Sequence, residues 1–237
     1  MFDIKEKNVL ITGGKGQVGA YLKSVFEKHC KSVIAVDFED FDVTSEKETS
    51  DFFEDLYRKC NVDVLINNAG ISTFEPFLER KEKDFKKVLD VNLWGSFNCI
   101  KNYVKNYKKA NQTEGKIINV GSIYGLVSPD PRIYTDLKRH SPEVYGASKA
   151  GLIQMTKYFA VHLSSLNIQV NCVSPGGIFN NKNPQGDSFI SSYSTRCPQD
   201  RMANLEDMIG PFLFLSSNFS NYVNGQNIVV DGGFTSW

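Results

Sequence analysis

Ser122, Tyr145 and Lys149 are the residues whose types and spacing best fit one kind of chemistry. Tyr145 and Lys149 stand four residues apart in YGASK, so on a helix they share one face. A free phenol has a pKa of about 10 and is a poor base at neutral pH. An ammonium beside it stabilises the phenolate and brings that pKa down. Ser122, in NVGSIYG, would hold a substrate oxygen in line, so the three residues indicate proton transfer at an oxygen atom.

A glycine-rich turn near the start of the chain gives a second signal. Gly14, Gly16 and Gly19 fit GxGxxG in TGGKGQVG, between a strand-like run and a helical pattern. Such a turn lets the backbone approach a pyrophosphate, and the helix start offers free N–H groups. Asp37 ends the next strand-like run, where an acid can bind both ribose hydroxyls of NAD and repel the 2′-phosphate of NADP. Two alternatives stay open: Asp37 as a helix or turn cap, and Lys15 as a contact to a 2′-phosphate.

Strand-like and helical segments alternate along the chain. The strand-like runs are continuously apolar, which suits strands buried on both faces of a parallel sheet; they cover 8–12, 32–37, 62–67, 116–120, 168–173 and 227–231. Helical patterns cover 17–29, 45–59, 82–107, 143–165 and 204–216. The alternation predicts an α/β fold, a Rossmann-type doubly wound parallel sheet forming a single domain over 1–237. Two loop-like stretches stand out, 126–144 and 176–203, and ligands of such sheets bind where long loops gather at the strand ends.

Composition narrows the classes of partner. The chain has 27 basic and 27 acidic residues, which argues against nucleic acid or an anionic membrane surface as the main partner. Without a signal peptide or a long apolar stretch, we expect a cytoplasmic protein with no membrane partner. Five scattered cysteines and three histidines, with no CxxC, favour reduced thiols and no metal site.

Read together, these motifs resemble the short-chain dehydrogenase/reductase family over essentially the whole chain. The matching pieces follow the family's order: TGGKGQVG, Asp42-Val43-Thr44, Asn67-Asn68-Ala69-Gly70, Val91-Asn92, Gly121-Ser122, Tyr145-xxx-Lys149, Ser174-Pro175-Gly176 and Val230-Asp231-Gly232-Gly233. The resemblance implies that Tyr145 is the catalytic acid/base and that Ser122 polarises the substrate oxygen. It further implies that Lys149 binds the nicotinamide ribose and tunes Tyr145, and that Asn92 holds a water in a proton relay.

The resemblance also implies a cofactor-binding set. The adenine would meet Asp42 and Val43, the Asn67–Gly70 run would form the turn beneath the cofactor, and Pro175, Gly176 and Ile178 would line the nicotinamide pocket. The full set expected to bind the cofactor is Gly13, Gly14, Gly16, Gln17, Val18, Gly19, Asp37, Asp42, Val43, Asn68, Ala69, Gly70, Tyr145, Lys149, Pro175, Gly176 and Ile178. We expect the cofactor to be NAD rather than NADP. Asn67, Asn68 and Asp231 could instead have mainly structural roles.

Three departures from the compact members of the family bear on the substrate. The glycines follow the TGxxGxxG spacing of extended members, the helix after the second strand is reduced to a turn, and 22 residues separate Ser122 from Tyr145. Extended members commonly act on nucleotide-linked sugars, yet the C-terminal part here resembles compact members. The loops also resemble compact dehydrogenases of bacterial surface-sugar pathways, including those of nonulosonic acids. A Thr often found after PGG is absent, with Asn180 and Asn181 nearby.

The insert 126–144 should lie over the active site, because both its ends are catalytic. Its polar residues Asp130, Arg132, Tyr134, Asp136, Lys138, Arg139 and His140 could meet a hydrophilic substrate, or form a solvated loop or a subunit contact. The candidate substrate residues are Tyr124, which precedes the insert, Arg132 and Tyr134 within it, and Asn180 in loop 176–203.

The sequence therefore predicts an oxidoreductase that transfers a hydride between NAD(H) and a secondary alcohol or ketone of a sugar or sugar derivative. Two alternatives remain: a 3-oxoacyl reductase, which would need an apolar acyl channel, and a dinucleotide-binding sensor or scaffold without turnover. The resemblance implies a homodimer or homotetramer, with one interface on the helices at 82–107 and 143–165 and another at the C-terminal strand and FTSW tail.

Overall fold

The computed structural model describes residues 3–134, 140–181 and 185–237. Its parallel sheet has six strands in the order β2-β1-β3-β4-β5-β6, as expected for a doubly wound Rossmann-type fold. The strands are β1 (Asn8–Thr12), β2 (Ser32–Val36), β3 (Val64–Asn67), β4 (Gly115–Val120), β5 (Ile168–Pro175) and β6 (Asn227–Val230). Each begins and ends close to a segment predicted from its apolar run.

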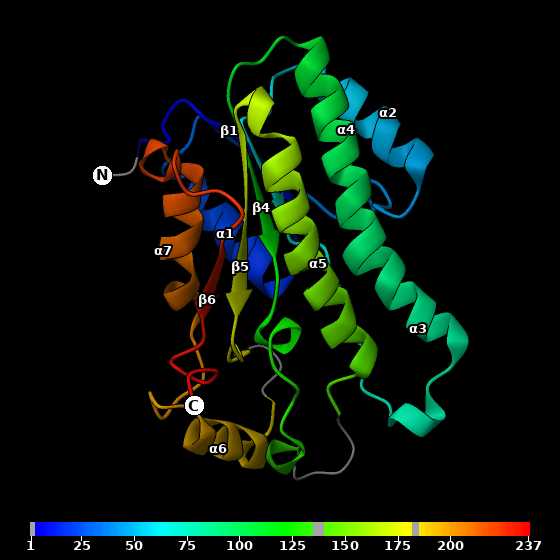
Figure 1. Ribbon diagram of the computed structural model, residues 1–237, viewed down its shortest axis with the longest axis vertical. Helices are drawn as coiled ribbons and strands as arrows, with labels where there is room; N and C mark the ends of the chain where they lie inside the picture. The colour runs from blue at the N-terminus through cyan, green and yellow to red at the C-terminus, as the bar shows by residue number, and fades with distance from the viewer. Residues whose placement is uncertain (1–2, 135–139, 182–184) are drawn as a thin grey trace.

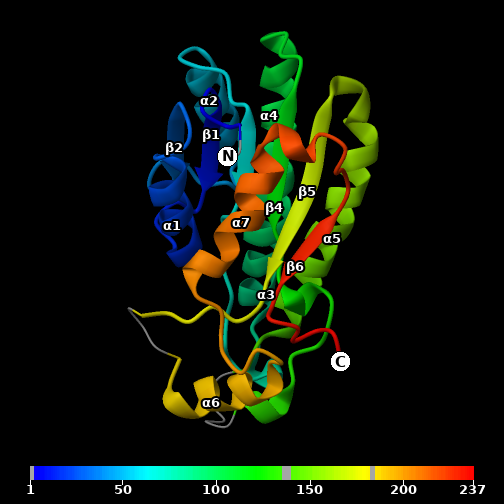
Figure 2. The same cartoon turned by 90° about the vertical axis from the view of Figure 1, so that its left-hand side faces the viewer.

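Helices cover both faces of this sheet (Figures 1 and 2). On one face lie α1 (Gln17–Phe26) and α7 (Leu205–Ser216). On the other lie α2 (Glu46–Tyr57), α4 (Ser96–Lys109) and α5 (Glu143–His162). The remaining helices are α3 (Glu82–Leu89), which leads into α4, and α6 (Asp187–Arg196), which lies beyond the carboxyl ends of the strands (Figure 1).

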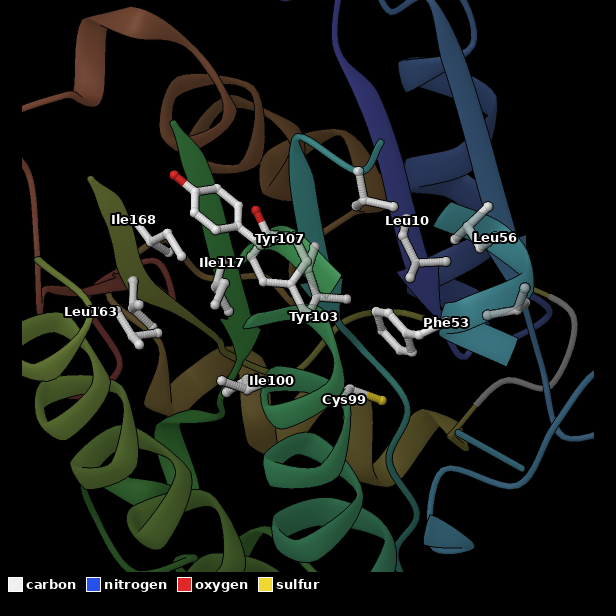
Figure 3. Close-up of a cluster of buried hydrophobic side chains, with 14 of the residues drawn as sticks. Leu10, Phe53, Leu56, Cys99, Ile100, Tyr103, Tyr107, Ile117, Leu163 and Ile168 are labelled. Atoms are coloured by element: carbon white, nitrogen blue, oxygen red, sulfur yellow. The ribbon is translucent and has the colours of Figure 1, made fainter. Parts of the chain in front are cut away.

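Alternate side chains of the strands feed two separate cores. Leu10 of β1 and Ile117 of β4 pack with Phe53 and Tyr103 under α2, α4 and α5 (Figure 3). Their neighbours in the strands, among them Val9 and Ile118, pack on the other face with side chains of α1 and α7. Because both faces are buried, successive strand positions are all apolar, which is the continuous pattern in the sequence.

Three details of the helices differ from, or refine, the sequence prediction. The helix expected at 82–107 contains a π-helical segment, Asp90–Gly95, between α3 and α4. The chain between β2 and α2 contains only turns, which confirms the reduced helix there. The expectation that 176–203 is simply a loop is wrong, because α6 forms within it. Contacts of its apolar side chains with neighbouring segments hold this serine-rich helix, whose own helix propensity is modest.

A third, smaller apolar cluster lies at the carboxyl edge of the sheet. It joins the insert to loop 176–203: Ile133 and Tyr134 of the insert are buried against Tyr193, Met202 and neighbouring residues. The rings of Tyr134 and Phe189 lie 5.4 Å apart between centroids. The described part of the insert is therefore packed onto α6.

The described ranges contain neither a membrane-spanning helix nor a metal-binding cluster of side chains. None of the helices there combines the length and the apolar composition that crossing a membrane requires. In the same ranges, no three or more His, Cys, Asp or Glu side chains are grouped so as to hold a metal ion. All five cysteines are free thiols.

Candidate active site

The glycine turn at the end of β1 requires residues without a Cβ. Gly13 has φ +66°, and a Cβ there would come within 2.8 Å of the Cα of Ala69. Gly14 donates its N–H to the carbonyl of Val36 at 2.8 Å, so the turn is tied to the end of β2. Gly16 is the N-cap of α1 and provides no side-chain cap. The first N–H groups of α1 thus remain available to an anion.

A cavity of about 730 Å³ opens over this turn. One side is formed by Asp37, Asp42 and Val43, and the other by the Asn68–Ile71 segment and Val91. The Asn68 amide donates to the carbonyls of Thr12 and Gly13 at 3.0 and 2.9 Å, which joins the ends of β3 and β1. The cavity therefore brings together most of the residues expected to bind the adenosine and pyrophosphate.

Acidic side chains surround the position expected for the adenosine ribose. Asp37 accepts a hydrogen bond from the backbone N–H of Lys15 at 2.8 Å. The ammonium of Lys15 lies 3.0 Å from Glu39, and both side chains are exposed. Asp40 accepts the N–H of Asp37 at 2.8 Å. Lys15, the residue that could meet a 2′-phosphate, is thus paired with a neighbouring carboxylate.

A second cavity, of about 460 Å³, continues from the first. Gln17, Val18, Asn68, Gly70 and Ile71 line both. The second cavity is also lined by the predicted catalytic and nicotinamide residues Ser122, Tyr145, Lys149, Pro175, Gly176 and Ile178. The structure therefore places the two halves of the expected site in one continuous space.

Helix α5 carries Tyr145 and Lys149 on one face, as their spacing predicts. The Lys149 ammonium lies 5.7 Å from the centre of the Tyr145 ring and donates to the carbonyl of Val120 at 2.6 Å. Lys149 is 4% exposed, and burial lowers its pKa to about 8. Burial raises the pKa of Tyr145, while the nearby Ser122 hydroxyl acts in the opposite direction. The phenol is therefore held neutral until something stabilises its anion.

Ser122 and Asn92 are fixed by local hydrogen bonds. Ser122 follows β4 and its Oγ accepts the N–H of Tyr124 at 3.2 Å. Asn92 lies in the π-helical segment, a feature frequent at functional sites. Its side-chain oxygen Oδ1 accepts the N–H of Ile71 at 2.8 Å. Its side-chain nitrogen Nδ2 donates to the carbonyl of Ile71 and to the hydroxyl of Ser148, each at 3.0 Å. The Asn92 side chain thus joins the β3–α3 loop to α5.

The four candidate substrate residues separate into two groups. Tyr124 and Tyr134 line the second cavity, and their hydroxyl oxygens lie 3.0 Å apart. Arg132 is exposed and its guanidinium pairs with Asp130 at 2.6 Å, away from the lining. Asn180 is also outside the lining, and its N–H is bonded to Gln185 at 3.2 Å. Asp136, Lys138 and Arg139 of the insert lie outside the described residues.

Several lining residues were not anticipated from the sequence. They come from the β3–α3 loop, the insert and the region of α6: Ser72, Phe74, Ser141, Gly177, Gln185, Phe189, Tyr193 and Met202. Tyr193 accepts the N–H of Gly177 at 2.6 Å, which holds α6 against the end of β5. The spacing of Phe189, Ile190 and Tyr193 in an otherwise polar segment is the signal that could have identified this helix.

Comparison with known proteins places the chain among dehydrogenases and reductases. Residues 17–235 match a family model described as enoyl-(acyl carrier protein) reductase. A 2-dehydro-3-deoxy-D-gluconate 5-dehydrogenase of Formosa agariphila is 31% identical, over 98% of this chain and 94% of its own length. A 3-oxoacyl-(acyl-carrier-protein) reductase of Thermotoga maritima is 33% identical, over 97% of this chain and 98% of its own length.

A solved structure shows the same relationship. The crystal structure of a short chain dehydrogenase from Leptospira borgpetersenii with bound NAD+ is 39% identical, with a TM-score of 0.89 over 98% of this chain and 94% of the other. These matches extend over nearly the whole length of both partners in each comparison. The chain belongs to the short-chain dehydrogenase/reductase family.

Proposed function

We propose that this protein is an NAD(H)-dependent oxidoreductase that interconverts a secondary alcohol and a ketone of a sugar or sugar derivative. The observation that carries the proposal is the position of Tyr145, with Lys149 and Ser122, in the second of two continuous cavities. We further propose that 1–237 acts as one domain, in which insert 126–144 and loop 176–203 enclose the substrate.

The residues at the first cavity fit a dinucleotide. Gly13 lets the turn pass against Ala69, where a Cβ would not fit, and the start of α1 offers uncapped N–H groups to a pyrophosphate. Val43 and Val91 provide apolar contact for an adenine ring. In the second cavity, Lys149 uses one of its N–H donors on Val120 O, so another is available to ribose hydroxyls.

The chain's own groups move the proton. A bound nicotinamide supplies the hydride donor or acceptor. Ser122 would hold the substrate oxygen by a hydrogen bond, and Tyr145 would donate its phenolic proton to that oxygen in reduction or accept it in oxidation. The Lys149 ammonium stabilises the phenolate formed in reduction. We further propose that Asn92 holds a water molecule of the proton relay.

The acidic surroundings of the adenosine ribose support NAD rather than NADP. Asp37 lines the first cavity, and Glu39 and Asp40 lie close to it. A 2′-phosphate there would face carboxylates, while Lys15 is already paired. The Leptospira borgpetersenii relative, which was crystallised with NAD+, lends further support.

The second cavity supports a hydroxyl-rich substrate. Its polar lining consists mainly of hydroxyl and amide groups, including those of Ser72, Tyr124, Tyr134, Ser141 and Gln185. Among the lining residues that the structure describes, Lys149 is the charged one. Apolar side chains make up the larger part of the wall, among them Ile71, Phe74, Ile123, Phe189 and Met202. The Formosa agariphila relative, named for a sugar-acid substrate, supports the same class.

A 3-oxoacyl reductase is the second candidate, and the Thermotoga maritima relative favours it. An acyl chain in the second cavity would lie near the hydroxyls of Tyr124 and Tyr134, which bond to each other at 3.0 Å, and would offer them no further hydrogen bond. A panel of D-gluconate, 2-dehydro-3-deoxy-D-gluconate and an acetoacetyl thioester, followed by absorbance of NADH, separates the two classes. Binding of NADH without turnover of any panel member would instead favour the sensor.

We also propose a homo-oligomer. Tyr158 and Val161 of α5 are 55% and 74% exposed, and Trp94 is 36% exposed. These exposed apolar residues lie within the helical segments of the first predicted interface, and we propose that they contribute to it. The C-terminal Trp237, 70% exposed, would belong to the second predicted interface.

Replacing Gly13 should weaken cofactor binding specifically. Gly13→Ala forces a Cβ towards Ala69 at an unfavourable φ, so NADH affinity measured by fluorescence should fall about tenfold or more. Gly210→Ala is the matched control, because nothing lies within 4 Å of a Cβ there. In α7 it should raise stability by roughly 0.5–1 kcal/mol and leave affinity unchanged. Equal NADH affinity in both variants would contradict the assignment of the first cavity.

Turnover should depend on the Tyr145 hydroxyl. Tyr145→Phe should lower kcat on the order of 10²-fold or more while NADH affinity survives. Because burial raises the pKa of Tyr145, alcohol oxidation, which needs the phenolate, should speed up with rising pH. Ketone reduction, which needs the phenol, should slow down only as the pH rises past this raised pKa, above the ordinary value of about 10. A Tyr145→Phe protein with a near-normal rate would exclude this mechanism.

Asp37 should determine the choice of cofactor. We expect kcat/KM of the wild type to be higher with NAD(H) than with NADP(H), and Asp37→Ser to narrow the difference by removing repulsion of the 2′-phosphate. Lys15→Gln serves as the comparison, because its ammonium is paired with Glu39 and should contribute little. Preference of the wild type for NADP(H), lost in Lys15→Gln, would show that Lys15 dominates.

The hydroxyl pair should affect the sugar substrate. Tyr134→Phe or Tyr124→Phe should lower kcat/KM about five- to 150-fold for the panel member turned over, at unchanged NADH affinity and with a small fall in melting temperature from the lost bond between the hydroxyls. Tyr222→Phe, at an exposed residue remote from both linings, is the control. If both cavity variants match the wild type, the insert has no part in substrate recognition and the sugar assignment loses its main support.

A further inference from the structure

We propose that Arg80 is a positioning residue, whose guanidinium fixes the first turn of α5, and with it Tyr145, against the wall of the substrate cavity. The expected effect of Arg80 on turnover rests on the proposed function, whereas its expected effect on the rigidity of α5 and the β3–α3 loop does not.

Arg80 is held from three directions although it belongs to neither cavity lining. Its side chain is 5% exposed. Nη1 donates to the carboxylate of Glu75 at 2.6 Å and to the hydroxyl of Thr73, and Nη2 donates to the carbonyl of Glu75 at 2.8 Å. Nε donates to the carboxylate of Glu143 at 3.2 Å. One side chain thus joins two segments 63 residues apart in sequence.

The segments that Arg80 joins both belong to the site. Thr73 and Glu75 flank Phe74, which lines the second cavity together with Ser72. Glu143 is the first residue of α5 and precedes Tyr145 by one helical half-turn. A shift of the loop relative to the helix would therefore move Phe74 relative to the Tyr145 hydroxyl.

A second connection lies on the other side of Tyr145. Asn92 binds the backbone of Ile71, at the start of the same loop, and donates to the hydroxyl of Ser148. That hydroxyl in turn donates to the carbonyl of Tyr145 at 2.8 Å. The Arg80–Glu143 and Asn92–Ser148 contacts therefore lie on either side of Tyr145 along α5. Together they couple the position of the β3–α3 loop to the position of this helical turn.

Arginine suits this position better than lysine does. Its planar fork reaches four acceptor groups at once, whereas an ammonium is a point donor on a flexible stem. The guanidinium is buried, while the side chains of Glu75 and Glu143 are 53% and 47% exposed, so geometry rather than reduced screening distinguishes these contacts. The N–H of His140 also bonds to the carbonyl of Phe74 at 3.2 Å, which leaves this part of the loop held on both sides.

The test compares Arg80→Ala, Arg80→Lys, Glu143→Ala and Glu75→Ala in the full chain. Arg58→Ala is the control, because it removes an arginine–carboxylate pair, with Asp55, on the remote helix α2. Hydrogen exchange is measured with NAD+ as the added ligand, on peptides spanning 71–80 and 143–150. NADH affinity and stoichiometry are measured by fluorescence, and kcat and KM with the member of the panel that the wild type turns over fastest.

We expect Arg80→Ala and Arg80→Lys to increase exchange in both peptides, and Glu143→Ala to increase it in 143–150. Glu75→Ala should increase it mainly in 71–80. In the first three variants kcat/KM should fall about 10- to 100-fold, at one NADH per chain and unchanged NADH affinity. Glu143→Ala added to Arg80→Ala should cost little more than Arg80→Ala alone, because the shared contact is already lost.

Three outcomes would overturn the proposal. They are wild-type exchange in 143–150 after loss of Arg80, wild-type kcat/KM in Arg80→Lys and Glu143→Ala, and a loss of activity matched by a loss of bound NADH. If Arg80→Ala does not fold, Arg80→Lys and Glu143→Ala decide the question. If the wild type turns over no panel member, the proposed function fails, while the exchange measurements still decide the role of Arg80.

Discussion

The burial of the Lys149 ammonium is the constraint on which the site depends. An ammonium that is 4% exposed is costly unless it is hydrogen-bonded, and here the carbonyl of Val120 accepts from it at 2.6 Å. The contact requires the end of β4 to lie under the first turns of α5. The same packing that accommodates the charge thus places Tyr145 beside Ser122.

The rest of the carboxyl edge is organised around this helix. Asn92 links α5 to the β3–α3 loop, while the cluster of Ile133, Tyr134 and Tyr193 closes the cavity from the side of α6. Each of these contacts joins segments that are distant in sequence. The two cavities meet because the glycine turn after β1 and the end of β4 lie at the same edge of one parallel sheet.

Features that arise from residues close together in the sequence could be predicted from it, whereas features that depend on contacts between distant segments could not. The strands were recognisable from continuous apolar runs, and the shared face of Tyr145 and Lys149 from their spacing. Helix α6 was missed because its serine-rich sequence gives little propensity, and contacts with the insert supply what the sequence lacks. The position of Arg132 was also beyond sequence reasoning, because its pairing with Asp130 depends on the local turn.

The insert shows the same limit for function. Its charged residues suggested a polar face towards the substrate, yet in the described part the residues that reach the cavity are Tyr134 and Ser141. The sequence around Ile133 and Tyr134 has no periodic apolar pattern that would mark them as buried. Only the tertiary structure shows that they pack against α6. In the described part of the insert, the charged residues therefore indicate the cavity lining less well than the aromatic residues do.

A crystal structure with NAD+ bound would test the central claim most directly, namely that Lys149 and Tyr145 serve the reacting end of the cofactor. We expect the nicotinamide ring in the 460 Å³ cavity, a ribose hydroxyl within hydrogen-bond distance of the Lys149 ammonium, and the ring's C4 facing the substrate side next to the Tyr145 hydroxyl. A dinucleotide bound with its nicotinamide outside this cavity, or Lys149 bonded to Val120 O alone, would contradict it.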